Sequence, residues 1–127
     1  MADNYEKLKR CGVKFFKAAP YGVMIGCFDL DKTDDLQWFT RVDYKMDGYD
    51  GVTFADDTQK PDIILVGMRK DLKKYTSTLA HECYHAMNWT YLWHGCNHEL
   101  RNDEPGAYFL GSLVEGCDKL FKQMGIQ

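Results

Sequence analysis

The sequence predicts an α+β domain in which helices lie on one face of a small, mostly antiparallel sheet. Three observations lead to this prediction. An apolar, β-branched run at residues 63–68 is typical of a strand. Short turn signals separate the strand candidates before it, and two long segments after it have the helical period. We expect one domain over residues 1–127, with the order N-terminal helix, three or four strands, and two helices.

The part of the chain before residue 70 is expected to supply the first helix and the sheet. The expected elements are an amphipathic helix within 4–18, a strand at 21–28, a helical turn ending at Trp38, and strands at 41–46, 52–55 and 63–68. The segment from Val13 to Phe16 fits either a helix or a strand. Thr33 or Asp34 is expected to cap the helical turn. We expect the strand at 63–68 to form an edge of the sheet.

The longest helix is expected in the segment that follows. It starts at Asp71 or, alternatively, at Thr76, each of which can cap it, and it ends near Trp93. The residues expected on its inner side are Leu79, Cys83, Ala86, Met87 and Thr90. We therefore expect Cys83 to lie in the core rather than to bind a metal.

A last helix is expected from Asn102 or Asp103 to about Met124. Pro105 falls in its first turn, where the missing N–H is harmless. Three small residues near its start are expected to let it approach the preceding helix closely: Gly106, Ala107 and Gly111.

The composition excludes several function classes. The net charge of −3 provides no basic field for nucleic acid, and no apolar run suggests a membrane span or a signal segment. The five cysteines are odd in number and irregularly spaced, which is typical of free thiols in a reducing cytoplasm. Aspartates crowd the loop at 29–35 but lack the spacing of a calcium-binding EF-hand, so we expect a solvated loop.

The stretch His81-Glu82-Cys83-Tyr84-His85 has the pattern His-Glu-x-x-His within the longest expected helix. Residues four apart lie about 40° from each other around a helix, so both imidazoles can reach one metal ion. Glu82 lies beside that face, where a carboxylate can activate a metal-bound water. The pattern therefore predicts a zinc site with His81 and His85 as ligands and Glu82 as the general base.

A catalytic zinc ion usually takes three protein ligands, so a third is needed after the motif. The histidines and carboxylates downstream include His94, His98, Glu99, Asp103, Glu104 and Glu115. The extended motif with a third histidine is excluded, because the sixth residue after His85 is Tyr91. Glu104 is favoured because it begins a helix that packs back on the motif helix and can hold a carboxylate rigidly. Alternatively, Glu104 binds no metal and is an acidic residue in the first turn of a helix, where the helix dipole favours a negative charge.

Two segments of the chain carry a family resemblance. They are Thr78-Leu79-Ala80-His81-Glu82-Cys83-Tyr84-His85-Ala86 and Asp103-Glu104-Pro105-Gly106-Ala107-Tyr108-Phe109-Leu110-Gly111. Together they resemble the minimal gluzincin-type zinc metallopeptidase domains of phages and prophages, which share a zincin-like fold with the IrrE/ImmA-type peptidases. The stretch 50–54 and the strand at 63–68 occur in the expected order, and the resemblance covers roughly residues 40–121.

The resemblance implies that His81, His85 and Glu104 bind zinc and that Glu82 acts as general base and general acid. Larger gluzincins often carry an acidic residue four positions after the ligand glutamate, where this chain has Tyr108. The hydroxyl of Tyr108 is expected either to bond a zinc ligand or an oxyanion, or to be satisfied in the core.

A second resemblance competes with the first. The pair His94-Gly95 after the motif resembles the SprT-type proteases, whose third zinc ligand is such a histidine. In that alternative, His94 or His98 completes the zinc site. His94, Cys96 and His98 can also bind a separate, adventitious metal.

These observations predict a zinc metalloendopeptidase that acts as a monomer on a protein or peptide substrate, in the cytosol of a bacterium or of a phage-infected host. We expect an extended substrate to pair with the strand at 63–68. The alternatives are a zinc-binding, phage-type interaction protein with little or no turnover, and a structural domain with vestigial histidines.

Overall fold

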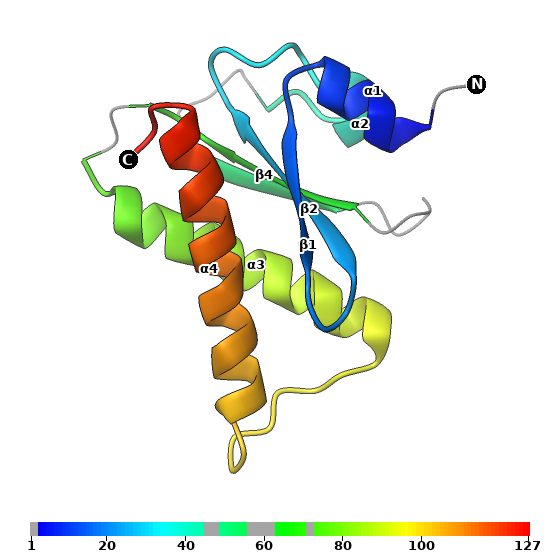
Figure 1. The fold of residues 1–127 in the computed structure, drawn as a ribbon, viewed down its shortest axis with the longest axis vertical. Coiled ribbons are helices and arrows are strands. Elements are labelled where there is room, and N and C mark those ends of the chain that lie inside the picture. The colour runs from blue at the N-terminus through cyan, green and yellow to red at the C-terminus, as the bar shows by residue number, and fades with distance from the viewer. Residues whose placement is uncertain (1–2, 45–48, 56–62, 71–72) are drawn as a thin grey trace.

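A mixed, four-stranded sheet forms the centre of a computed structural model that describes residues 3–44, 49–55, 63–70 and 73–127. The strands are β1 (Lys14–Ala18), β2 (Val23–Asp29), β3 (Gly51–Ala55) and β4 (Ile63–Met68), in the spatial order β1-β2-β4-β3. The central strands β2 and β4 are parallel, whereas β1 and β3 pair with them antiparallel (Figure 1). The predicted α+β class is confirmed.

Helices in the described part of the chain cover both faces of this sheet. They are α1 (Asn4–Arg10), α2 (Gln37–Thr40), α3 (Tyr75–His94) and α4 (Glu104–Gln123). Figure 1 shows α1 and α2 together, away from the crossing pair α3 and α4. Ile64 and Val66 of β4 pack with α3 and α4, whereas Leu65 packs with α1 and α2. The prediction that helices lie on one face is therefore wrong, because β4 is apolar on both sides and both sides need a cover.

Strand β4 lies between β2 and β3, inside the sheet. All of its residues are buried. The prediction that residues 63–68 form an edge is therefore wrong, and β3 occupies the edge beside β4. A continuous apolar run is typical of a strand covered on both faces and flanked on both sides, which is the position of β4.

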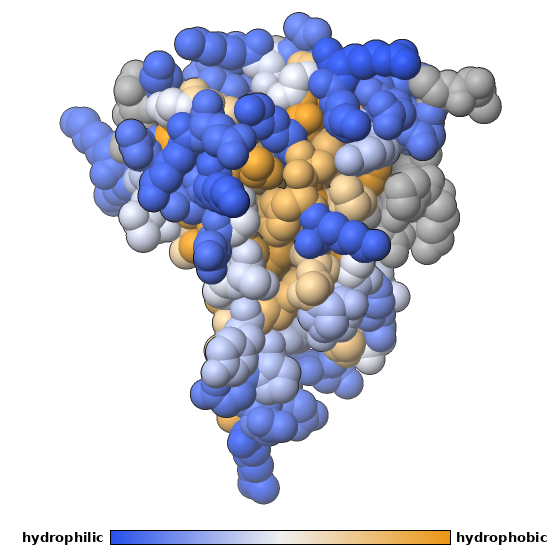
Figure 2. Space-filling view, in the orientation of Figure 1, coloured by the Kyte–Doolittle hydropathy of each residue, from blue (hydrophilic) through white to orange (hydrophobic). Residues whose placement is uncertain are grey.

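The segment that fitted either a helix or a strand forms β1. Helix α1 ends at Arg10, and β1 pairs with β2 in a register that places Lys14 opposite Cys27. Lys14 and Lys17 are exposed on this edge strand, where charged side chains oppose pairing with another chain. Figure 2 shows a narrow apolar band over the β1–β2 hairpin, with hydrophilic residues on both sides of it.

The expected strand at 41–46 is not a strand over 41–44, and residues 45 and 46 lie outside the described ranges. Tyr44 is buried, and its hydroxyl accepts a hydrogen bond from the backbone N–H of Leu36 at 2.7 Å. The alternation of polar and apolar residues therefore reflects a loop that Tyr44 anchors in the core.

Two helices begin elsewhere than the sequence predicts. Helix α2 starts at residue 37, so neither Thr33 nor Asp34 caps it. Helix α3 starts at Tyr75, which makes Thr76 its second residue rather than its cap, and Asp71 lies outside the described residues. At α2 the carboxylate of Asp35 accepts a hydrogen bond from the backbone N–H of Gln37 instead, and at α3 the cap position is Lys74, whose side chain makes no capping hydrogen bond.

Helix α4 begins as predicted, with Asp103 at the cap position and Pro105 in the first turn. Gly106 permits a close approach to α3, because a Cβ atom there would lie 3.0 Å from the hydroxyl oxygen of Tyr91. Gly111 plays no such role: no described atom beyond its own helix backbone and chain neighbours lies within 4 Å of where its Cβ would be. The prediction for Gly111 is therefore wrong.

Cysteines from three elements meet in the core between the sheet and the helix pair. Cys27 of β2, Cys83 of α3 and Cys117 of α4 are fully buried in one apolar cluster. A hydrogen bond with Cys117 and burial raise the pKa of the Cys83 thiol. Cys83 is therefore a core residue despite its place inside the motif, as predicted, and its thiol is protonated and unreactive.

Candidate metal centre

Helix α3 presents both histidines of the motif on its exposed side. The Nε2 atoms of His81 and His85 lie 3.1 Å apart, and the two rings are inclined at 78° with their centroids 4.8 Å apart. Two imidazole nitrogens that each lie about 2.0–2.1 Å from a tetrahedral zinc ion are about 3.3 Å from each other. The two side chains thus converge at close to the separation that a shared zinc ion requires.

Glu82 lies between this exposed face and the core, with 5% of its surface exposed. The hydroxyl of Thr53 in β3 donates a hydrogen bond to Oε1 of Glu82 at 2.7 Å and lies 3.1 Å from the Glu82 carbonyl oxygen. The other carboxylate oxygen, Oε2, lies 3.9 Å from Nε2 of His81. One oxygen of the glutamate is therefore held by the sheet, while the other lies near a motif histidine.

Strand β3 lies close against α3 at Gly51. A Cβ atom there would lie 2.9 Å from Cγ2 of Thr78 and 3.0 Å from Cγ of Glu82. Side chains alternate along a strand, so residues 51, 53 and 55 share the face toward α3, and all three are small: Gly51, Thr53 and Ala55. Because these residues are small, β3 lies near enough to α3 for Thr53 to reach Glu82.

Two cavities meet at His81 and Glu82. The larger, about 490 Å³, is open to solvent and is lined by residues 42–44, Tyr49, residues 51–54 and the α3 residues His81, Glu82, His85 and Trp89. The smaller, about 320 Å³, is lined by residues 50–51 and by the first two turns of α3. The larger cavity carries aromatic and aliphatic side chains close to the motif, so it can hold an apolar group there.

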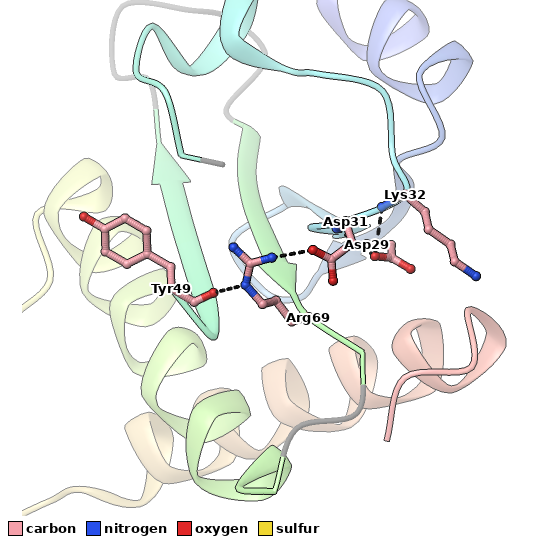
Figure 3. A network of polar contacts seen from close by, with 5 residues as sticks. All are labelled: Asp29, Asp31, Lys32, Tyr49 and Arg69. Atoms are coloured by element: carbon pink, nitrogen blue, oxygen red, sulfur yellow. Dashed lines mark hydrogen bonds and ion pairs between the residues drawn. The ribbon is translucent and has the colours of Figure 1, made fainter. Parts of the chain in front are cut away.

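Arg69, directly after β4, ties together two segments beside this site (Figure 3). Its Nε donates to the carbonyl oxygen of Tyr49 at 2.5 Å, and its guanidinium pairs with Asp31. Asp29, the last residue of β2, accepts hydrogen bonds from the backbone N–H groups of Asp31 and Lys32. Because Tyr49 lines the larger cavity, Arg69 fixes one of its walls.

The residues that the family resemblance implies in helix α4 do not line the cavities at the motif. Glu104 and Tyr108 are both exposed, Tyr108 by 76%, and neither lines the two cavities at the motif. The start of α4 packs at Tyr91, which lies roughly 80–120° around the axis of α3 from the motif histidines. No three His, Cys, Asp or Glu side chains of the described residues gather closely enough to hold a metal. The structure brings the motif residues together without Glu104, whose role as a ligand stays a prediction.

The alternative third ligands have partners on α3 itself. Nδ1 of His94 lies 2.9 Å from the carbonyl oxygen of Thr90, one turn earlier in the helix. Nε2 of His98 lies 2.8 Å from Oδ1 of Asn88. Cys96, between these histidines in the sequence, is half-buried. Among the described residues, none of these three side chains forms a metal-holding group with the motif histidines, although the ring of His98 stacks on that of Tyr84.

Three residues of the site carry no sequence motif. Gly51 belongs to an Asp-Gly pair that predicts only a turn, Thr53 is an ordinary strand residue, and Arg69 follows a strand. The available signal is the alternation of small residues in β3, which indicates a strand that packs closely on another element. That signal does not identify the element on which the strand packs.

Comparisons with protein-family models, with curated proteins and with solved structures found no match to this chain. None of the helices in the part of the chain that the structure describes is long and apolar enough to cross a membrane.

The close approach of β3 to α3 leads to a stability prediction. Gly51→Ala is expected to lower the free energy of unfolding by about 1–3 kcal/mol, because the added methyl group forces β3 and α3 apart. Gly111→Ala is the matched control: it adds a methyl group into open space on a helix and is expected to raise stability by about 0.5–1 kcal/mol. Urea unfolding measures both changes. A Gly51→Ala protein as stable as the wild type would show that the contact is looser than described.

Proposed function

We propose that the protein is a zinc-dependent metallopeptidase that hydrolyses a peptide bond in a protein or peptide substrate. One observation carries the proposal: the Nε2 atoms of His81 and His85 converge to 3.1 Å beside a buried glutamate that lines a cavity. Imidazole nitrogens at this separation suit zinc. The resemblance to minimal gluzincin-type domains supports the same function. On the basis of this resemblance we also propose that the fold is zincin-like.

The roles of the residues follow from their positions. His81 and His85 would hold the zinc ion, which would supply a bound water of lowered pKa and polarisation of a substrate carbonyl group. Glu82 takes the proton of the attacking water and returns it to the leaving amine. The 3.9 Å between Oε2 of Glu82 and Nε2 of His81 supports this role, because it brings a carboxylate oxygen next to a metal-ligating nitrogen.

Strand β3 is the proposed binding edge for the substrate. It is the outer strand of the described sheet on this side, and its residues line the larger cavity. An extended peptide can pair with such an edge through main-chain hydrogen bonds. The aromatic rings of Tyr49 and Trp89 then give the cavity an affinity for apolar side chains of the substrate.

A second candidate is a zinc-binding interaction protein with little or no turnover. Large apolar side chains are exposed around the connection between α3 and α4: Leu92 by 67%, Leu100 by 90% and Tyr108 by 76%. Exposed large apolar side chains of this kind can contact a partner protein. A protein that binds one zinc ion yet cleaves nothing in a broad peptide library would favour this candidate.

The variant Glu82→Gln tests the proposed peptidase function. It is expected to bind one zinc ion with the affinity of the wild type and to lose hydrolysis by about 10²–10⁴-fold, because an amide cannot accept the proton of the water. The control variant His81→Ala is expected to lose zinc as well. Competition with a chelator measures zinc affinity, and mass spectrometry of a peptide library measures cleavage. Full activity of Glu82→Gln would rule out Glu82 as the base.

A second set of variants identifies the third ligand. On the family resemblance, Glu104→Gln is expected to weaken zinc binding by more than about 100-fold, since loss of a ligand exceeds the effect of losing a residue that only orients one. His94→Ala and His98→Ala are then expected to bind zinc as the wild type does. The reverse result, with normal zinc affinity in Glu104→Gln and weakened zinc binding in His94→Ala or His98→Ala, would assign the third ligand to that histidine.

A further inference from the structure

The hydroxyl of Thr53 makes a short contact with the glutamate of the motif, from an element that lies far from it in the sequence. It lies 2.7 Å from Oε1 of Glu82 and 3.1 Å from the carbonyl oxygen of the same residue. Glu82 is 5% exposed, so water has little access to compete for these acceptors. A contact of this length inside the protein fixes the atoms that it joins.

The hydroxyl has one proton, and the carboxylate is the better acceptor for it. The carbonyl oxygen of Glu82 lies within α3, where it accepts from the N–H four residues later, that of Ala86. The carboxylate oxygen is closer, and hydrogen bonds to a charged acceptor are roughly twice as strong as neutral ones. Thr53 therefore donates to Oε1.

The donor itself is held rigidly. Thr53 is opposite Val66 in the register of β3 and β4, so its backbone position is set by the central strands of the sheet. A β-branched side chain is stiff at χ1, which fixes the direction of the hydroxyl. Glu82, by contrast, is a long side chain with several rotamers, and holding it in one of them has an entropic cost.

We propose that Thr53 is a positioning residue that holds Oε1 of Glu82 and leaves Oε2 to exchange protons in the cavity. The part of this inference that concerns proton exchange rests on the proposed peptidase function; the fixing of the carboxylate does not. The hydrogen bonds of the Thr53 hydroxyl in the described structure go to Glu82 and not to either histidine, so Thr53 acts on the base and not on metal binding.

Two substitutions separate the hydroxyl from the shape of the side chain. Thr53→Val removes the hydroxyl at nearly constant volume, and Thr53→Ser keeps it. In the zinc-loaded protein, Thr53→Val is expected to lower kcat by about 10- to 100-fold, with KM within about twofold and zinc affinity unchanged. Thr53→Ser is expected to keep kcat within about threefold of the wild type.

Thr90→Val is the matched control. Thr90 is also a buried threonine, and its hydroxyl donates to the carbonyl oxygen of Ala86 within α3. This variant removes one buried hydroxyl hydrogen bond without touching Glu82, so its kcat is expected to equal that of the wild type. A loss of kcat in Thr90→Val as large as in Thr53→Val would assign the effect to general destabilisation and overturn the proposal.

A second readout does not depend on activity. The readout is the ¹³C NMR spectrum of protein labelled with carboxyl-¹³C glutamate. The signal of Glu82 is assigned as the one that is absent from the spectrum of Glu82→Gln. We expect Thr53→Val to shift this signal and Thr53→Ser and Thr90→Val to leave it in place. If the wild type cleaves no peptide but the signal moves in Thr53→Val, the peptidase function fails while the positioning role holds. An unmoved Glu82 signal in Thr53→Val overturns the positioning role whatever the activity.

Discussion

The contact between β3 and α3 is the constraint on which the candidate site depends. Gly51 allows the strand to lie against the helix at Glu82, and Thr53 then supplies a hydroxyl to the carboxylate. A buried carboxylate without a partner is costly, so the hydrogen bond is part of what makes the position of Glu82 tolerable. The sheet therefore supports α3 and also contributes the Thr53 side chain of its edge strand to the candidate site.

One side of helix α3 is exposed and the other side packs in the core, and the motif lies at the boundary between these two sides. Adjacent residues are about 100° apart around a helix, so a glutamate directly after His81 points away from the histidine face and toward the sheet. Cys83, the next residue, is turned fully into the core. This arrangement explains how Glu82 is both buried and part of a cavity wall.

Much of the fold could be predicted from local pattern. The strand Ile63–Met68 has the predicted bounds, the two long helices begin or end within a few residues of their predicted limits, and Cys83 lies in the core. These segments are long and strongly periodic or continuously apolar, so burial alone specifies them. The convergence of His81 and His85 follows in the same way from a spacing of four residues on a helix.

The remaining features depend on contacts between distant residues. The place of β4 inside the sheet requires its parallel pairing with β2, about forty residues earlier, and no local pattern encodes that pairing. The contact of Thr53 with Glu82 likewise joins two elements 29 residues apart. The segment 41–44 has the alternation of a strand, but Val42 is exposed and Tyr44 is buried, so the two apolar residues do not share the face of a sheet.

Zinc-edge X-ray absorption of the wild-type protein loaded with one equivalent of zinc tests the central claim most directly. The account predicts nitrogen and oxygen ligands at about 2.0–2.1 Å, the outer-shell scattering of two imidazole rings, and no sulfur ligand, because Cys83 lies in the core. A sulfur shell at about 2.3 Å, or a spectrum without two imidazoles, would contradict a metal centre built on His81 and His85.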